Sequence, residues 1–137
     1  MTARKSDWVE GLWGVLEGEA ARREFAYGHC VRLAAECVQA VTGEELLERC
    51  ELAIAAAAEE GGISLASLEE EVTKLLGSPV PMSLARRGDI VLLDLGENGP
   101  ALGVCVGDKI ACAGAARDRG GVVYLRLDRG IKAWRVG

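Results

Sequence analysis

The chain has 137 residues, half of them hydrophobic and 27% charged, which is the balance of one globular domain with a single core. Its net charge of -5 comes from 21 acidic and 16 basic side chains, so it lacks the basic excess that displaces counterions from a nucleic acid. No window is apolar for the length of a membrane span, and the charged N-terminal residues do not resemble a signal peptide. These totals predict a single domain over residues 1–137, folded in the cytosol, with no nucleic-acid partner and no membrane insertion.

The five cysteines are Cys30, Cys37, Cys50, Cys105 and Cys112, and no two of them form a closely spaced pair. A disulfide framework and a zinc site both normally show such pairs. We therefore expect neither a metal nor a cofactor, and folding in a reducing compartment.

An amphipathic helix is predicted within residues 1–24, over about residues 6–20. Trp8, Leu12 and Leu16 fall at helical spacing on one stripe, and Trp13 lies beside it. Two tryptophans on one stripe suit a docking face for a partner, because aromatic residues are enriched at interfaces. The same two side chains are equally suited to covering the core of their own domain.

A second helix is predicted from His29 to Thr42, where Gly43 supplies a stop signal. Cys30 then lies in the first turn, where the unpaired amides and the positive end of the helix dipole favour a thiolate. The competing interpretation is that a free cysteine on an apolar helix face is a small core residue. His29 does not readily act as its base, because adjacent helical residues point about 100° apart.

Two further helices are predicted before residue 88, over about residues 44–59 and 65–76. The second of these has two candidate caps, Ser67 in a capping-box spacing with Glu70, and Ser64 as its rival. Residues 25–87 thus form a helical half that contains the helix of Cys30.

Residues 88–137 change to short apolar runs separated by glycines, which predicts four or five antiparallel strands. The two-residue turn at Gly107 and Asp108 predicts a tight hairpin, in which positions 101, 103 and 105 share a face with 110, 112 and 114. Helices followed by strands, without alternation, indicate an α+β fold.

Three stretches occur in a familiar order: "YGHC" at the start of a helix, then "RRGDIVLLDL", then "ALGVCVGDKI". In this order they resemble the NlpC-type cell-wall peptidases, a compact branch of the papain-like superfamily. With Phe25, the "TG" at residues 42–43 and "AWR" at residues 133–135, the chain is similar to small proteins of that superfamily encoded among phage and prophage tail genes. The resemblance implies a papain-like fold with Cys30 at the position of the nucleophile.

The same resemblance places Ala101 where the catalytic histidine belongs, and a methyl group neither accepts nor donates a proton. The third, orienting residue of the triad is expected near Cys112, where no suitable polar side chain is present. We therefore expect a non-catalytic, peptidase-like structural component of a phage or prophage tail, folded in the bacterial cytoplasm and incorporated in the virion. Its expected partners are other tail proteins, through Trp8 and Trp13.

Two other hypotheses stay open. One is an active cysteine amidase or endopeptidase that degrades peptidoglycan, with Cys30 as nucleophile and His29, or a residue of a partner chain, as an unorthodox base. The other is a bacterial scaffold or regulatory protein unrelated to phage.

Overall fold

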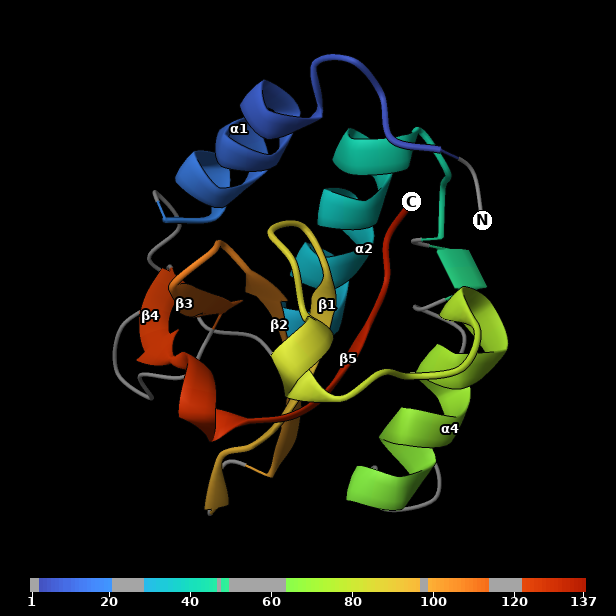
Figure 1. Cartoon of the computed structure of the whole chain (residues 1–137), viewed down its shortest axis with the longest axis vertical. Helices are drawn as coiled ribbons and strands as arrows, with labels where there is room; N and C mark the ends of the chain where they lie inside the picture. The colour runs from blue at the N-terminus through green and yellow to red at the C-terminus, as the bar shows by residue number, and fades with distance from the viewer. Residues whose placement is uncertain (1–2, 21–28, 47, 50–63, 97–98, 114–121) are drawn as a thin grey trace.

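Helices form the N-terminal half of the chain and a sheet forms the C-terminal half, as Figure 1 shows. The computed structural model describes residues 3–20, 29–46, 48–49, 64–96, 99–113 and 122–137. Its named helices are α1 (Trp8–Ala20), α2 (His29–Thr42) and α4 (Leu65–Leu76). The predicted α+β class is confirmed, and so are the predicted bounds of α2 and α4.

The ends of α2 and α4 follow from their own sequences. At the end of α2, Gly43 adopts a φ of +81°, a left-handed conformation that L side chains rarely take, and its N–H bonds to the carbonyl of Gln39 at 2.7 Å. At the start of α4, the hydroxyl of Ser64 accepts a hydrogen bond from the amide of Ser67 at 3.1 Å. Ser64 is therefore the cap, and the capping box expected from Ser67 and Glu70 is not used.

The helix expected from residue 44 does not begin there. Residues 43–46 are not helical and Leu46 is buried, whereas residues 48–49 are helical, as predicted. Residues 47 and 50–59, which carry the rest of that prediction, lie outside the described residues.

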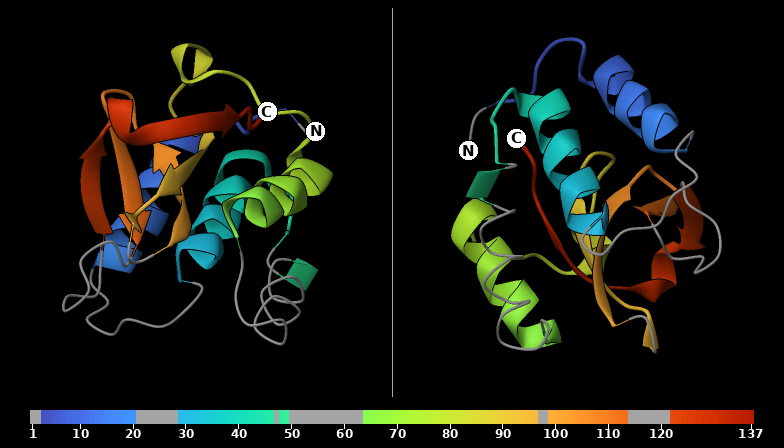
Figure 2. Two further views of the ribbon diagram at one scale, coloured as in Figure 1. Left: turned by 90° about the horizontal axis from the view of Figure 1, so that it is seen from below. Right: turned by 180° about the vertical axis from the view of Figure 1, so that it is seen from behind.

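The sheet contains five antiparallel strands: β1 (Ile90–Asp94), β2 (Pro100–Cys105), β3 (Lys109–Ala113), β4 (Val122–Arg126) and β5 (Gly130–Trp134). Their order is β4-β3-β2-β1-β5, so the two outermost strands are consecutive in the chain. Only the short 3-10 helix η3 (Leu127–Arg129) joins them. The sheet therefore has to curl so that its two edges approach, and Figure 2 shows this curvature.

The hairpin of β2 and β3 has the predicted register. Cys105 pairs with Ile110 and Val104 with Ala111, and the amide of Val106 bonds to the carbonyl of Lys109 at 2.9 Å. Residues 101, 103 and 105 therefore share a face with 110 and 112, as the two-residue turn predicted.

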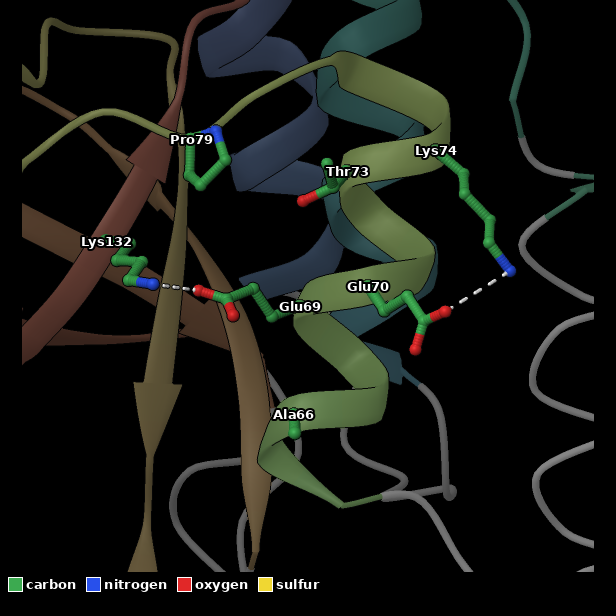
Figure 3. Close-up of a pocket in the computed structure, with 7 residues that line it drawn as sticks. All are labelled: Ala66, Glu69, Glu70, Thr73, Lys74, Pro79 and Lys132. Carbon is green, nitrogen blue, oxygen red and sulfur yellow. Dashed lines mark ion pairs between the residues drawn. The ribbon is translucent and has the colours of Figure 1, made fainter.

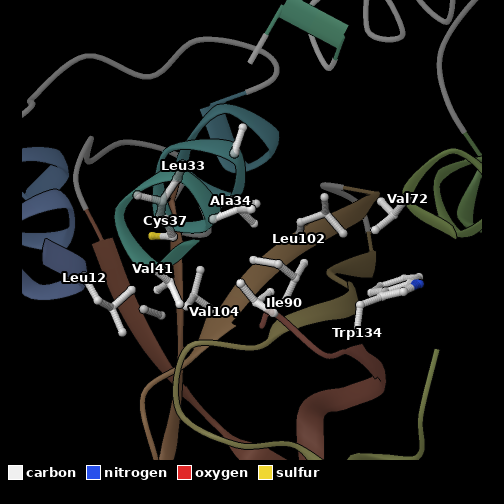
Figure 4. Close-up of a cluster of buried hydrophobic side chains, with 14 of the residues drawn as sticks. Leu12, Leu33, Ala34, Cys37, Val41, Val72, Ile90, Leu102, Val104 and Trp134 are labelled. Carbon is white, nitrogen blue, oxygen red and sulfur yellow. The ribbon is translucent and has the colours of Figure 1, made fainter. Parts of the chain in front are cut away.

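Each face of the curled sheet is buried in its own hydrophobic cluster. The first cluster fills the space between the helices and the sheet and is drawn in Figure 4; its larger members include Leu12, Leu16, Leu33, Val38, Val41, Ile90, Leu92, Leu102, Val104 and Trp134. The second cluster lies on the opposite face and consists of Val91, Leu93, Ala101, Cys105, Ile110, Cys112 and Ala133. Four of these seven side chains are alanine or cysteine.

Gly103 shows how little room the second cluster has. A Cβ atom at this position would lie 2.5 Å from Cγ2 of Ile110 and 2.9 Å from the carbonyl oxygen of Ala111. Only glycine fits there without displacing its neighbours.

Among the residues that the structure describes, no helix has the length and apolar character needed to cross a membrane.

Candidate functional site

Cys30 lies in the first turn of α2, the position that the sequence predicts for it. The residue is partly exposed, but its side chain packs against the second cluster. Burial raises the pKa of the Cys30 thiol, although backbone hydrogen bonds from Leu102, Val31 and Cys30 itself favour the thiolate. The helix N-terminus thus does not outweigh desolvation, and the neutral thiol is the stable form.

Ala101 is a member of the second cluster, with 3% of its surface exposed. It lies on β2 and pairs with Leu93 of β1. The position that the resemblance assigns to a catalytic imidazole is therefore enclosed by aliphatic side chains, and its own side chain offers no proton acceptor.

Cys112 on β3 is fully buried in the same cluster. Its S–H donates to the carbonyl oxygen of Leu102 at 3.6 Å, a long and weak hydrogen bond. Burial raises the pKa of Cys112 from 9.0 to about 12, and the charge that Cys30 would carry as a thiolate adds to this shift. The two thiols are thus close enough to interact, and the backbone of Leu102 contacts both.

The three positions that the resemblance associates with a triad thus share one hydrophobic cluster. Cys30 packs against the cluster that contains Ala101 and Cys112, although the three come from α2, β2 and β3. Cys30 and Cys112 supply two thiols and Ala101 supplies a methyl group. Each thiol has a raised pKa. This set provides no general base and no group that would hold one in place.

His29 is the first residue of α2, and its side chain lies outside the described part of the structure. It is the only histidine in the sequence. The sequence argument that adjacent helical residues point about 100° apart thus stays a prediction for His29.

No group of three histidine, cysteine, aspartate or glutamate residues suited to holding a metal ion occurs among the described residues. Cys105 also belongs to the second cluster, but its thiol faces the carbonyl of Gly107 at 3.9 Å. The charges that act on it are those of Asp89, Arg87 and Asp108, so it lies in different surroundings from Cys30 and Cys112.

The two tryptophans of α1 pack against the domain itself. Trp8 and Trp13 are partly buried side chains on the edge of the first cluster. The guanidinium of Arg4 lies 4.3 Å from the ring centroid of Trp8, a cation–π contact. The sequence left open whether these tryptophans dock a partner or cover the core of their own domain. The buried part of both side chains covers the domain's own core.

Asp89 is the polar residue whose importance the sequence analysis missed. Its carboxylate is fully buried and accepts hydrogen bonds from three separate segments: the Arg86 amide at 2.8 Å, the Val136 amide at 3.1 Å and the Arg4 guanidinium at 3.1 Å. Burial lowers the pKa of Arg4, and the carboxylate of Asp89 opposes that shift. Asp89 therefore ties the N-terminal segment and the C-terminal residues to the start of β1 and so stabilises the fold.

A groove between α4 and β5 is lined by Ala66, Glu69, Glu70, Thr73, Lys74, Pro79 and Lys132, as Figure 3 shows. Its charged side chains are already paired, Lys132 with Glu69 and Lys74 with Glu70. None of the candidate site residues Trp8, Trp13, Cys30 and Ala101 lines this groove, so the groove and the Cys30 site are separate features of the surface.

Comparison with known proteins gives one family. The family model described as "Domain of unknown function (DUF6950)" matches residues 3–136. Among curated proteins, none matches this chain.

Proposed function

We propose that this chain, which belongs to the DUF6950 family, is a non-catalytic, peptidase-like structural component of a phage or prophage tail. The observation that most directly supports the absence of catalysis is the set of side chains at the Cys30 site. A thiol at the start of a helix packs against an apolar cluster that contains Ala101, the residue at the position that the resemblance assigns to the base.

The chemistry of this site argues against turnover for two reasons. A cysteine peptidase attacks with a thiolate, and burial raises the pKa of the Cys30 thiol and so depletes that form. It also needs an acid to protonate the leaving amine, and within the described part of the chain the buried members of the cluster against which Cys30 packs are aliphatic side chains and thiols. Members of a triad act as a unit, so the loss of the base alone removes several orders of magnitude in rate.

The tail context and the papain-like character of the fold rest on the resemblance of the sequence. "YGHC", "RRGDIVLLDL" and "ALGVCVGDKI" occur in the order found in small peptidase-like proteins of phage tail regions. The described architecture, helices followed by a curled antiparallel sheet, is compatible with that resemblance. A rigid domain of this kind acts through surface complementarity to neighbouring subunits.

The first test is hydrolysis of purified peptidoglycan by the full chain, with Cys30→Ala as the matched variant. We expect no release of cell-wall fragments above background from either protein. Clear hydrolysis by the parent protein that disappears in Cys30→Ala would replace our proposal with an active cysteine amidase or endopeptidase.

A second test asks whether Ala101 occupies the position of the missing base. Ala101→His places an imidazole beside the second cluster, where a base would stabilise the thiolate of Cys30 as an ion pair. We expect its alkylation by iodoacetamide at neutral pH to be about tenfold faster than in the parent, equivalent to roughly one unit of pKa. Ala101→Gln, with similar volume but no base, is the control, and equal rates in the two variants would show that position 101 does not face the thiol.

A third test concerns the assembly. Mass spectrometry of purified tail particles should detect this chain together with the major tail subunits. Recovery only as free protein in the cytosolic fraction would contradict a virion role and would favour a scaffold or regulatory protein unrelated to phage.

The active-enzyme alternative has one observation in its favour. Cys30 is partly exposed, and the amides of Cys30 and Val31 point toward its thiol, as they do for an activated cysteine at a helix N-terminus. Under this alternative the base is His29 or comes from a partner chain, and the hydrolysis assay distinguishes the two functions.

A further inference from the structure

The Cys30 and Cys112 thiols form the strongest pair of reactive groups that the proposed function leaves unused. The two residues are far apart in the sequence, so no spacing pattern connects them. In the folded chain, Cys30 packs against the hydrophobic cluster to which Cys112 belongs.

The two thiols share Leu102 of β2 as a neighbour. The S–H of Cys112 donates to the carbonyl of Leu102 at 3.6 Å, and the backbone of the same residue hydrogen-bonds to the thiol of Cys30. Each sulfur therefore lies within hydrogen-bonding reach of one residue of β2. Packing against one cluster brings Cys30 to the face of the sheet that carries Cys112, and the effect of a Cys30 thiolate on the pKa of Cys112 agrees with this placement.

We propose that Cys30 and Cys112 form an intramolecular disulfide when the protein meets a small-molecule disulfide oxidant. The bond would join the first turn of α2 directly to β3 and so connect the helical half of the domain to its sheet. It would close a long loop of the chain, which is the case in which a cross-link most restricts the unfolded state.

Thiol–disulfide exchange with oxidised glutathione accounts for every atom. Cys30, the more exposed thiol, attacks one sulfur of oxidised glutathione, forms a mixed disulfide and releases one glutathione thiolate. The Cys112 thiolate then attacks the Cys30 sulfur, forms the new S–S bond and releases the second glutathione thiolate. The two protons lost by the protein thiols are taken up by the two glutathione thiolates, so the protein is oxidised by two electrons and the glutathione disulfide is reduced by two.

The surroundings of the other described cysteines explain why this pair is selected. Cys105 faces the carbonyl of Gly107 and the charges near Asp89, and Cys37 lies in the first cluster on the opposite side of the sheet. Burial raises the pKa of both Cys30 and Cys112, so exchange should be slower than at ordinary exposed thiols. If the proposed tail function holds, the link would form after the virion leaves the reducing cytosol; the cross-link itself does not depend on that function.

The test uses the purified full chain, incubated with oxidised glutathione at about pH 8.5, where an ordinary thiol is half ionised. Peptide mapping by mass spectrometry should find the peptides of Cys30 and Cys112 joined. The thermal midpoint of the oxidised protein should rise by roughly 10 °C and should return to its starting value on reduction.

Matched variants make the assignment specific. Cys105→Ala should form the same link, whereas Cys30→Ala should form none. Cys112→Ala should stop at the glutathione adduct on Cys30, which reports accessibility even if this variant is less stable. The proposal would be overturned if the parent protein stops at that adduct, if the link joins other cysteines, or if both thiols stay free in the native protein but cross-link after denaturation.

Discussion

Replacement of Asp89 by alanine is the most direct test of how the fold is held together. Asp89 has no exposed surface, and its carboxylate contacts Arg4, Arg86 and Val136. The substitution removes an acceptor from two backbone amides and from one guanidinium, while Arg4 stays largely enclosed.

The expected cost follows from these contacts. Removal of one partner of a buried ion pair costs about 3–5 kcal/mol, because the other charge is left without compensation. Each backbone amide left without an acceptor adds about 1 kcal/mol or more. Asp89→Ala should therefore lower the free energy of unfolding by about 5 kcal/mol, a large part of the total of roughly 5–15 kcal/mol available to a domain.

Denaturant titrations followed by circular dichroism measure this change. Asp89→Asn should lose about 2–3 kcal/mol, because the amide oxygen replaces part of the acceptor function but not the charge. Asp94→Asn is the matched control, since Asp94 is an exposed carboxylate that accepts a hydrogen bond from Gly96 at 2.9 Å, and it should change stability by less than about 0.5 kcal/mol.

A double-mutant cycle between Asp89 and Arg4 isolates their interaction. With Arg4→Met as the second substitution, we expect a coupling energy of about 1–3 kcal/mol. Additive effects, or an Asp89→Ala protein as stable as Asp94→Asn, would refute the view that this carboxylate joins the two ends of the chain.

Three further perturbations test the core and its thiols. Gly103→Ala should lower the free energy of unfolding by about 1–3 kcal/mol, because its Cβ would lie 2.5 Å from Ile110. Gly14→Ala is the control and should be neutral or slightly stabilising, because a Cβ there has nothing within 4 Å. Equal effects of the two substitutions in denaturant titrations would contradict this packing. Trp8→Ala should lower the free energy of unfolding by about 2–3 kcal/mol, because the ring covers the first cluster. If the free energy of unfolding stays unchanged and the variant is no longer incorporated into tail particles, Trp8 belongs to a docking face instead. The pKa of Cys112 is raised to about 12 in the folded chain, so this thiol ionises first in the unfolded chain. The stability that the neutral Cys112 thiol contributes is therefore fully present below about pH 9 and is lost as the pH rises toward 12. Between about pH 8 and pH 10.5 the parent protein should therefore lose about 2 kcal/mol more than Cys112→Ala, and parallel pH profiles would show that this thiol does not contribute.

Local physical chemistry was sufficient to predict most of the helices and strands. Gly43 ends α2 and the turn at Gly107 and Asp108 sets the hairpin register, because both effects depend on backbone conformation within a few residues. The cap of α4 shows the limit, because Ser64 and Ser67 satisfy the same local rule and only the actual start of the helix selects Ser64.

The candidate site was only partly predictable. Cys30 at a helix start and the absence of a base at position 101 follow from the order of short motifs. The role of Asp89 did not follow, because its partners Arg4 and Val136 come from opposite ends of the chain, and no local pattern signals a contact between residues so far apart.

The sequence by itself determined the α+β class, the position of Cys30 at the start of a helix and the alanine at position 101. Those features depend on residue identity and on periodicity over a few turns or strands. Only the tertiary structure decided which cluster the Cys30 thiol packs against, that Cys112 belongs to the same cluster and that Asp89 joins both ends of the chain. Burial and contact between distant segments arise from the packing of α2 onto the curled sheet, and that packing sets the pKa of each thiol.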